Sequence, residues 1–160
     1  MTSQKIAIGL VAVALFVGSM AAHAADYSVG FEAYQRGYYG TALRIFRLLA
    51  NQGNANAQNL LGIIYENGRG IPRSYLEAAK WYRKAADQGD ANAQYNLGVM
   101  YGTGQSVPQD FVLAHMWFNL AAKQGDSTAR ANRDIVAKRM TVEQIAEAQR
   151  LAREWKPTSQ

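Results

Sequence analysis

Cysteine is absent from all 160 residues, and histidine and proline are scarce. Without cysteine the chain has no disulfide and no lipid-modified cysteine behind an export signal, so its stability must come from packing. The acidic residues do not gather at a metal-ligand spacing such as H-E-x-x-H, and no S-x-x-K pattern offers a serine nucleophile. The composition therefore predicts no metal and no cofactor.

Catalysis finds little support in the remaining residues. Once residues 1–24 are set aside, His115 is the one histidine, and no nucleophile and orienting acid accompany it in the pattern. We interpret His115 as a partly buried structural residue. We therefore expect no catalytic residues, and we predict that the protein is not an enzyme.

The most apolar run lies at the N-terminus. Lys5 precedes Ile6–Val17, and the small-residue pattern Ala22–Ala24 follows. This order is typical of a signal peptide cleaved after residue 24. A retained membrane anchor is the alternative, but it needs about 20 apolar residues and this run is shorter. We therefore expect an exported protein, periplasmic or secreted, with no stable membrane anchoring after cleavage and one domain over 25–160.

One 36-residue segment occurs twice without a gap, at Ala55–Asp90 and at Ala91–Asp126. The two copies agree at 16 of 36 positions, and several of the mismatches exchange one apolar residue for another. A fixed period of this length predicts an architecture of stacked repeats. A shorter related unit, 27–54, precedes the pair, and a diverged segment, 127–156, follows it.

Each copy reads as two helices joined by a turn that proline closes. A side chain that can cap a helix start stands directly before the first helix of each unit. The residue before each of these caps is a glycine, which can end the preceding helix in a left-handed conformation. These expected N-caps are Asn54, Asp90 and Asp126. The second helices are expected to begin at Ser74 and Asp110. Ser74 and Glu77 have the spacing of a capping box.

Glycine recurs inside the first helix of each copy, at Gly62 and Gly98. A glycine inside a helix costs about 1 kcal/mol relative to alanine, so its recurrence indicates that the second helix approaches closely there. The residues expected opposite these glycines are Ala78 and Ala114, with Trp81 and Trp117 filling the space beyond.

The repeat pattern decays after Asp126. Arg133 and Asp134 replace the Leu-Gly pair, so a partner helix should approach less closely, as suits a polar unit that terminates a repeat core. Thr141 and Gln144 predict a capping box for a final helix. This segment carries +3 of the +4 charge expected after signal removal. The basic residues of this cap that we single out are Arg139, Arg150 and Arg153.

The two copies share the pattern A-x-A-Q-x-x-L-G-x-x-Y-x-x-G-x-x-x-P-x-x-[YF]-x-x-A-x-x-W-[YF]-x-x-A-A-x-Q-G-[DN]. This pattern resembles the Sel1-like repeat, a relative of the tetratricopeptide repeat, and the shorter unit is closer to the tetratricopeptide form. The resemblance implies an all-α, right-handed α-solenoid of antiparallel helix pairs with a C-terminal capping helix. It also implies a protein scaffold whose inner surface is lined by the first helix of each pair, and no particular ligand.

The resemblance places eight residues in that inner groove. They are Tyr27, Phe31, Tyr34, Asn59, Ile63, Glu66, Tyr95 and Val99. The first-unit aromatics have an alternative interpretation, packing against each other at a chain end. Nucleic acid is disfavoured as a partner, because the aromatic residues recur at core positions of the repeat and do not alternate with arginines.

The function predicted from these features is a non-enzymatic adaptor or scaffold in the bacterial cell envelope that binds a segment of a protein partner in the groove. The alternative is a binder of an envelope glycan or anionic polymer through the basic cap. An aromatic groove would provide contact area for an extended or helical segment.

Overall fold

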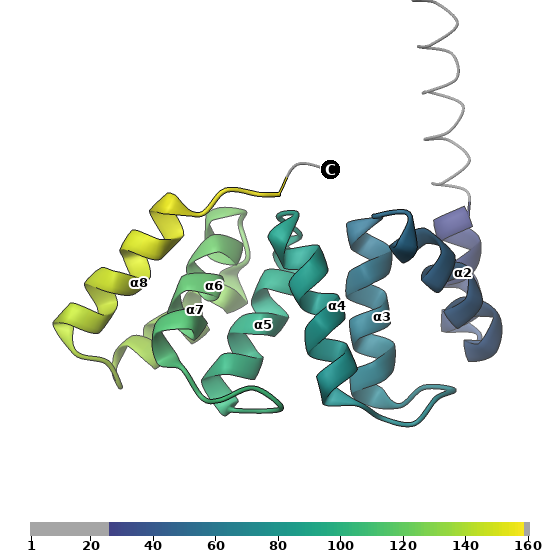
Figure 1. Cartoon of the computed structure of the whole chain (residues 1–160), viewed down its shortest axis with the longest axis horizontal. Coiled ribbons are helices and arrows are strands. Elements are labelled where there is room, and N and C mark those ends of the chain that lie inside the picture. Colours follow the sequence, from purple (N-terminus) through teal and green to yellow (C-terminus); the bar gives the residue numbers. More distant parts are fainter. Residues whose placement is uncertain (1–25, 159–160) are drawn as a thin grey trace, which may run out of the picture.

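The computed structural model describes residues 26–158, and every regular element in that part of the chain is a helix (Figure 1). Residues 26–35 form the first helix. The helices that follow are α2 (Tyr39–Asn51), α3 (Ala55–Asn67), α4 (Tyr75–Asp87), α5 (Ala91–Thr103), α6 (Phe111–Lys123), α7 (Ser127–Ala137) and α8 (Val142–Glu154). The expected signal peptide, residues 1–24, lies outside the described residues. Between residues 26 and 158, no helix is long and apolar enough to cross a membrane.

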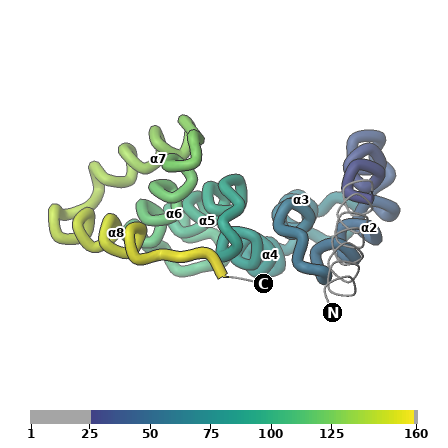
Figure 2. Tube along the Cα trace, turned by 90° about the horizontal axis from the view of Figure 1, so that it is seen from above, coloured from purple at the N-terminus to yellow at the C-terminus, as the bar shows by residue number. Residues whose placement is uncertain are grey.

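The helices form a right-handed α-solenoid of antiparallel pairs, as the sequence predicted. We name the first helix of each pair an A helix (helix 26–35, α3, α5 and α7) and the second a B helix (α2, α4, α6 and α8). The closest packing is within pairs, α3 on α4 and α5 on α6, and each pair also contacts the next one. Seen from above, the chain forms an arc, and the A helices lie along its inner side (Figure 2).

The predicted helix starts are confirmed. Asn54, Asp90 and Asp126 each accept a hydrogen bond from the amide three residues on, at 2.8–2.9 Å. Asp110 caps α6 in the same way, through the amide of Leu113. The glycines expected to be left-handed are so, with φ between 92° and 102°. Local hydrogen-bonding side chains therefore define where the helices begin.

The capping box predicted at Ser74 and Glu77 is only half formed. The Ser74 hydroxyl accepts from the Glu77 amide at 3.3 Å, but the Ser74 amide donates to the carbonyl of Tyr65 at 2.8 Å. The Glu77 carboxylate binds Lys80 instead. A backbone carbonyl of α3 thus accepts from the amide that a capping box would need. At the start of α8, Thr141 and Gln144 form the complete box that was predicted.

The residues expected opposite Gly62 and Gly98 are wrong by one helical turn. A Cβ built on Gly62 would lie 2.4 Å from ring atoms of Tyr82, and one on Gly98 would lie 2.6 Å from ring atoms of Phe118. Aromatic rings of the B helix, and not Ala78 and Ala114, therefore occupy the space that the glycines leave. Trp117 is buried, as expected, whereas Trp81 is half-buried.

The last pair differs from the others, as the replacement of the Leu-Gly pair predicted. Both α7 and α8 pack mainly against α6 and make few contacts with each other. Trp155, which follows α8, meets buried Trp117 of α6 edge-on, with 6.4 Å between ring centroids. The chain then runs back along the molecule, where the Thr158 amide donates to the carbonyl of Asp87 at 2.8 Å. The C-terminal segment thereby reaches the end of α4.

Candidate interaction surface

Side chains join neighbouring A helices along the inner side of the arc. Asn96 of α5 donates its side-chain N–H to the side-chain oxygen Oδ1 of Asn59 in α3 at 3.1 Å. One unit further on, Asn132 of α7 donates to the Tyr95 hydroxyl at 3.3 Å. Asn59, a predicted groove residue, is only 7% exposed, so this side chain supports the surface from below. These bridges hold the A helices at fixed spacing.

The aromatic residues of the first unit form one stack. The ring centroids of Tyr27 and Phe31 are 6.3 Å apart, and those of Phe31 and Tyr34 are 6.5 Å apart, both in stacked geometry. Tyr34 also meets Tyr39 of α2 edge-on, and its hydroxyl accepts from Arg69 at 2.6 Å. The mutual packing considered as an alternative therefore describes these side chains, yet Phe31 remains 39% exposed. Their contact with a partner stays a prediction.

The middle of the inner side holds Ile63 and Glu66. Ile63 is half-buried and packs against the apolar clusters on both sides of it. The Glu66 carboxylate accepts a hydrogen bond from the Tyr82 hydroxyl at 2.6 Å. Burial, together with this hydrogen bond to Glu66, raises the pKa of Tyr82. Glu66 is thus already engaged by a side chain of its own unit.

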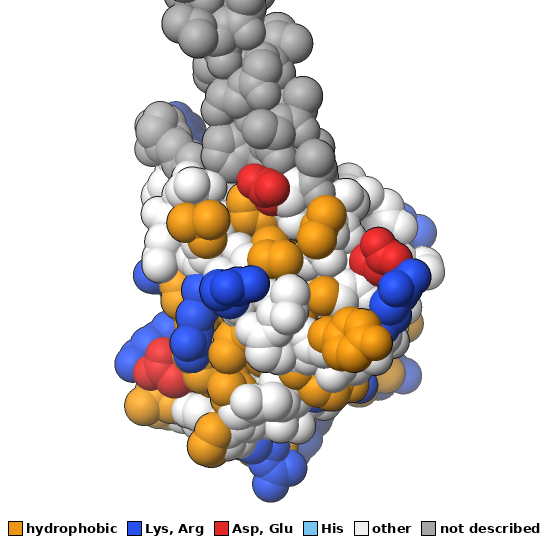
Figure 3. All heavy atoms as spheres, turned by 90° about the vertical axis from the view of Figure 1, so that its right-hand side faces the viewer, with side chains coloured by type: hydrophobic (Ala, Val, Ile, Leu, Met, Phe, Trp, Pro, Cys, Tyr) orange, Lys and Arg blue, Asp and Glu red, His pale blue; other side chains and the backbone are white. Residues whose placement is uncertain are grey.

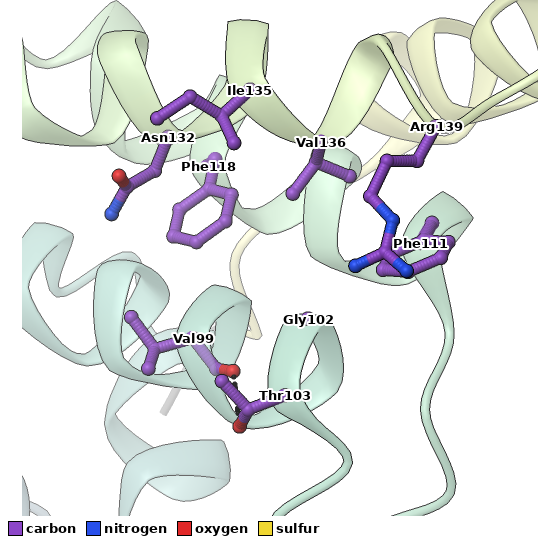
Figure 4. Close-up of a pocket in the computed structure, with 9 residues that line it drawn as sticks. All are labelled: Val99, Gly102, Thr103, Phe111, Phe118, Asn132, Ile135, Val136 and Arg139. Atoms are coloured by element: carbon purple, nitrogen blue, oxygen red, sulfur yellow. Dashed lines mark hydrogen bonds between the residues drawn. The ribbon is translucent and has the colours of Figure 1, made fainter.

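At the C-terminal end of the inner side, α5, α6 and α7 enclose a pocket of about 230 Å³ (Figure 4). Val99, a predicted groove residue, contributes to its wall, and Tyr95 packs beside it on the Phe118 ring with 5.8 Å between centroids. The other lining residues are Gly102, Thr103, Phe111, Phe118, Asn132, Ile135, Val136 and Arg139. We name this cavity the α5–α7 pocket.

Two residues that line the α5–α7 pocket differ from their counterparts in the first repeat copy. Gly102 stands where the first copy has Glu66, and Phe118 stands where it has Tyr82. In the first copy the Glu66 carboxylate and the Tyr82 phenol at these positions are hydrogen-bonded to each other; in the second, neither polar group is present. Sequence reasoning missed the pocket, although the paired exchange is visible when the copies are aligned.

The three arginines of the basic cap lie in different settings. Arg150 of α8 forms ion pairs with Glu147 and Glu154, which offset its charge. Arg153 lies exposed on the same helix. Arg139 follows α7 at the edge of the α5–α7 pocket, with its guanidinium carbon 4.7 Å from the centroid of the Phe111 ring. Arg139 thus lies at the α5–α7 pocket, whereas Arg150 and Arg153 lie on α8.

Apolar side chains also gather on the N-terminal end face, over helix 26–35 and α2 (Figure 3). Large exposed side chains there include Val29, Tyr38 and Leu48, at 54%, 63% and 58% exposure. Within residues 26–158, no group of three or more histidine, aspartate or glutamate side chains is arranged to hold a metal ion. The surface thus offers apolar contact in several places.

His115 is more deeply buried than expected. It is 3% exposed, and its Nδ1 has no hydrogen-bond partner among the described residues. Burial, reinforced by the positive charge of Arg133, lowers the pKa of His115. A buried imidazole whose Nδ1 has no partner among the described residues, and whose charged form is disfavoured by burial, suits a packing role.

This burial predicts a pH-dependent stability. The unfolded chain, with an ordinary histidine pKa near 6.5, takes up a proton before the folded protein does. Stability should therefore fall as the pH drops below about 6.5, by at most about 1.4 kcal/mol per pH unit from this residue. His115→Leu, which introduces the residue found at the aligned position 43, should remove this component. Urea unfolding of both proteins at pH 7.5, 6.5 and 5.5 measures it, and parallel pH profiles would refute the assignment.

Comparison with known proteins agrees with this architecture. The Sel1 repeat family model matches residues 55–90 and 91–126. A protective antigen of uropathogenic Escherichia coli strains, described as displaying an SLR fold, is 31% identical over 83% of this chain, with a TM-score of 0.78. A Sel1 repeat protein from Oxalobacter formigenes is 30% identical over 81%, with a TM-score of 0.67. The chain spans 29% and 56% of the lengths of these two structures. No curated protein matches.

Proposed function

Because the chain belongs to the Sel1-repeat family, whose fold generally serves as a scaffold for protein–protein interaction, we propose that it is an adaptor of the bacterial cell envelope. It binds a segment of a partner protein along the inner side of the arc. The envelope location rests on the signal-peptide pattern of residues 1–24. No step of chemistry is required of it.

The observation that carries this proposal is a preformed inner surface with apolar side chains in each unit. Phe31 is partly exposed, Ile63 and Val99 are half-buried, and side-chain bridges hold the helices that present them. A surface that is already ordered loses little conformational entropy on binding. Its length along several A helices suits an extended or helical segment better than a small molecule.

Site-specific photocrosslinking in intact cells tests the proposal. A photoreactive phenylalanine analogue in place of Phe31 or of Val99 should cross-link the same partner protein, because both positions lie on the inner side. The same analogue at exposed Lys80, on the B helix α4, is the matched control and should give none.

A second variant relates the cross-link to the groove itself. Phe31→Ala combined with Tyr34→Ala should lower the cross-link formed at position 99 at least about fivefold, because it removes a contact area worth roughly 1 kcal/mol or more. Equal cross-linking from position 80, or an undiminished yield in the double variant, would refute groove binding.

A further inference from the structure

We propose that the α5–α7 pocket anchors an acidic segment of the partner protein: one apolar side chain enters the pocket and a neighbouring side-chain carboxylate binds Arg139. The inference rests on the proposed function, since it specifies what the groove recognises at its C-terminal end. The experiment is therefore chosen to distinguish a failure of this anchor from a failure of groove binding as a whole.

The size and lining of the pocket favour a single apolar side chain. Sites for drug-sized ligands usually enclose about 300–1,000 Å³, whereas this pocket encloses about 230 Å³. Its walls are the apolar groups of Val99, Phe118 and Val136, with Ile135 exposed beside them. Anchors of this kind, seated in a small apolar pocket, contribute much of the affinity of protein interfaces.

One charged group of the pocket is available to select the ligand. The Thr103 hydroxyl already donates to the Val99 carbonyl, and Asn132 donates to Tyr95. Arg139 is the one charged residue that lines the pocket, and no carboxylate within residues 26–158 pairs with it. A guanidinium has five N–H donors and no acceptor, so its natural complement is a carboxylate.

The surroundings of Arg139 add to this preference. Its guanidinium carbon lies over the Phe111 ring, a contact that uses none of its N–H donors, so these are available for a carboxylate. Lys138 lies next to it in the chain. Of the two acids nearest in sequence, Asp134 is paired with Arg133, and Glu143 forms no ion pair with Arg139. The local field therefore favours a negatively charged segment.

A sugar ring fits this place less well than an acidic peptide. Carbohydrate would need an open aromatic face for contact, but Arg139 covers the Phe111 ring and Tyr95 packs against the Phe118 ring. The remaining apolar space is the pocket between α5, α6 and α7, with side chains of all three helices around it (Figure 4). The observations therefore favour a protein partner.

The chain provides its own way to close the pocket. Gly102→Glu combined with Phe118→Tyr copies into the second repeat the hydrogen-bonded Glu66–Tyr82 pair of the first, and should close the pocket because both positions line it. A Cβ at position 102 meets only ordinary contacts, the nearest at 3.7 Å from Ala114. Arg139→Gln, at an exposed position, removes the charge without closing the pocket. Arg44→Gln, exposed on α2, is the matched control.

Selection from a random peptide library displayed on phage provides the probe. We expect peptides enriched on the purified protein to carry an apolar residue within two positions of an aspartate or glutamate. Their affinity should fall about 30-fold in the closed-pocket variant, about three- to tenfold in Arg139→Gln, and not at all in Arg44→Gln. Amidating the peptide carboxylate should cost as much as Arg139→Gln and add nothing further to it, as a double-mutant cycle would show.

Other outcomes overturn the anchor. Selected peptides that bind the closed-pocket and Arg139→Gln variants normally, but lose affinity in Phe31→Ala/Tyr34→Ala, would leave the groove standing and refute the anchor. Enrichment of basic or acid-free peptides, or tighter binding of soluble glycan strands than of any peptide, would also refute it. So would a wild-type dimer that becomes monomeric in the closed-pocket variant by sedimentation, because the occupant would then be a second copy.

Discussion

Gly98→Ala is expected to lower the free energy of unfolding by about 1–2 kcal/mol, although alanine is normally the better helix residue. The new methyl group would lie 2.6 Å from two atoms of the Phe118 ring, which is itself buried. Because the contact is so short, overpacking here should cost about 2–3 kcal/mol, at the upper end of the usual range, against a gain of about 1 kcal/mol in helix propensity. Urea unfolding followed by far-ultraviolet circular dichroism measures the net change.

Gly102→Ala is the matched control, one turn further along α5. Its methyl group would meet the Ala114 Cβ at 3.7 Å, an ordinary contact. The substitution therefore changes only the helix propensity of the residue, so this variant should be more stable than wild type by about 0.5–1 kcal/mol. The two substitutions in one helix should thus have opposite signs. Stabilisation by Gly98→Ala would contradict the ring–glycine contact.

Trp117→Ala should have a larger effect, a loss of about 3–5 kcal/mol, because it empties one of the largest buried volumes of the chain. Trp117 is 2% exposed and contacts Trp155, while Arg83 lies over its ring at 5.2 Å. Since this contact attaches the end of α8 to α6, amide hydrogen exchange should accelerate more in α8 than in α3. Denaturant unfolding and exchange mass spectrometry together measure both effects.

Trp117→Phe is the control for this loss. It keeps an aromatic ring and removes an indole N–H that has no hydrogen-bond partner among the described residues. A buried unpartnered donor carries a desolvation cost of about 1–3 kcal/mol, so its removal should offset part of the lost volume. The phenylalanine variant should therefore lose less than half as much stability as the alanine variant. Equal losses would mean that the indole N–H is satisfied.

Sequence reasoning predicted the repeat, the pairing of helices and their starts. These features depend on local signals: a side chain such as Asp90 caps the amide three residues later, whatever surrounds it. The same reasoning chose the wrong partners for the glycines. Ala78 and Tyr82 lie four residues apart on one face of α4, so periodicity alone does not say which turn of α4 meets Gly62. That choice depends on how the two helices pack.

The candidate surface was predicted less completely than the fold. The groove residues were assigned from the resemblance, and the structure uses Asn59 and Glu66 for internal hydrogen bonds. The α5–α7 pocket depends on Gly102 and Phe118, which are distant in sequence from Arg139 and meet only through the packing of three helices. Comparing the two copies position by position, and not only for what they share, would have indicated it.

The bond from Thr158 to Asp87 has a consequence for the order of folding. In a solenoid each unit contacts only its neighbours, so structure can grow from any point by closing short loops. The contact between Thr158 and Asp87 instead closes a loop of 71 residues that contains α5, α6, α7 and α8. Closing so long a loop early would cost more chain entropy than closing those between adjacent helices. The C-terminal segment should therefore dock last in folding and detach first in unfolding.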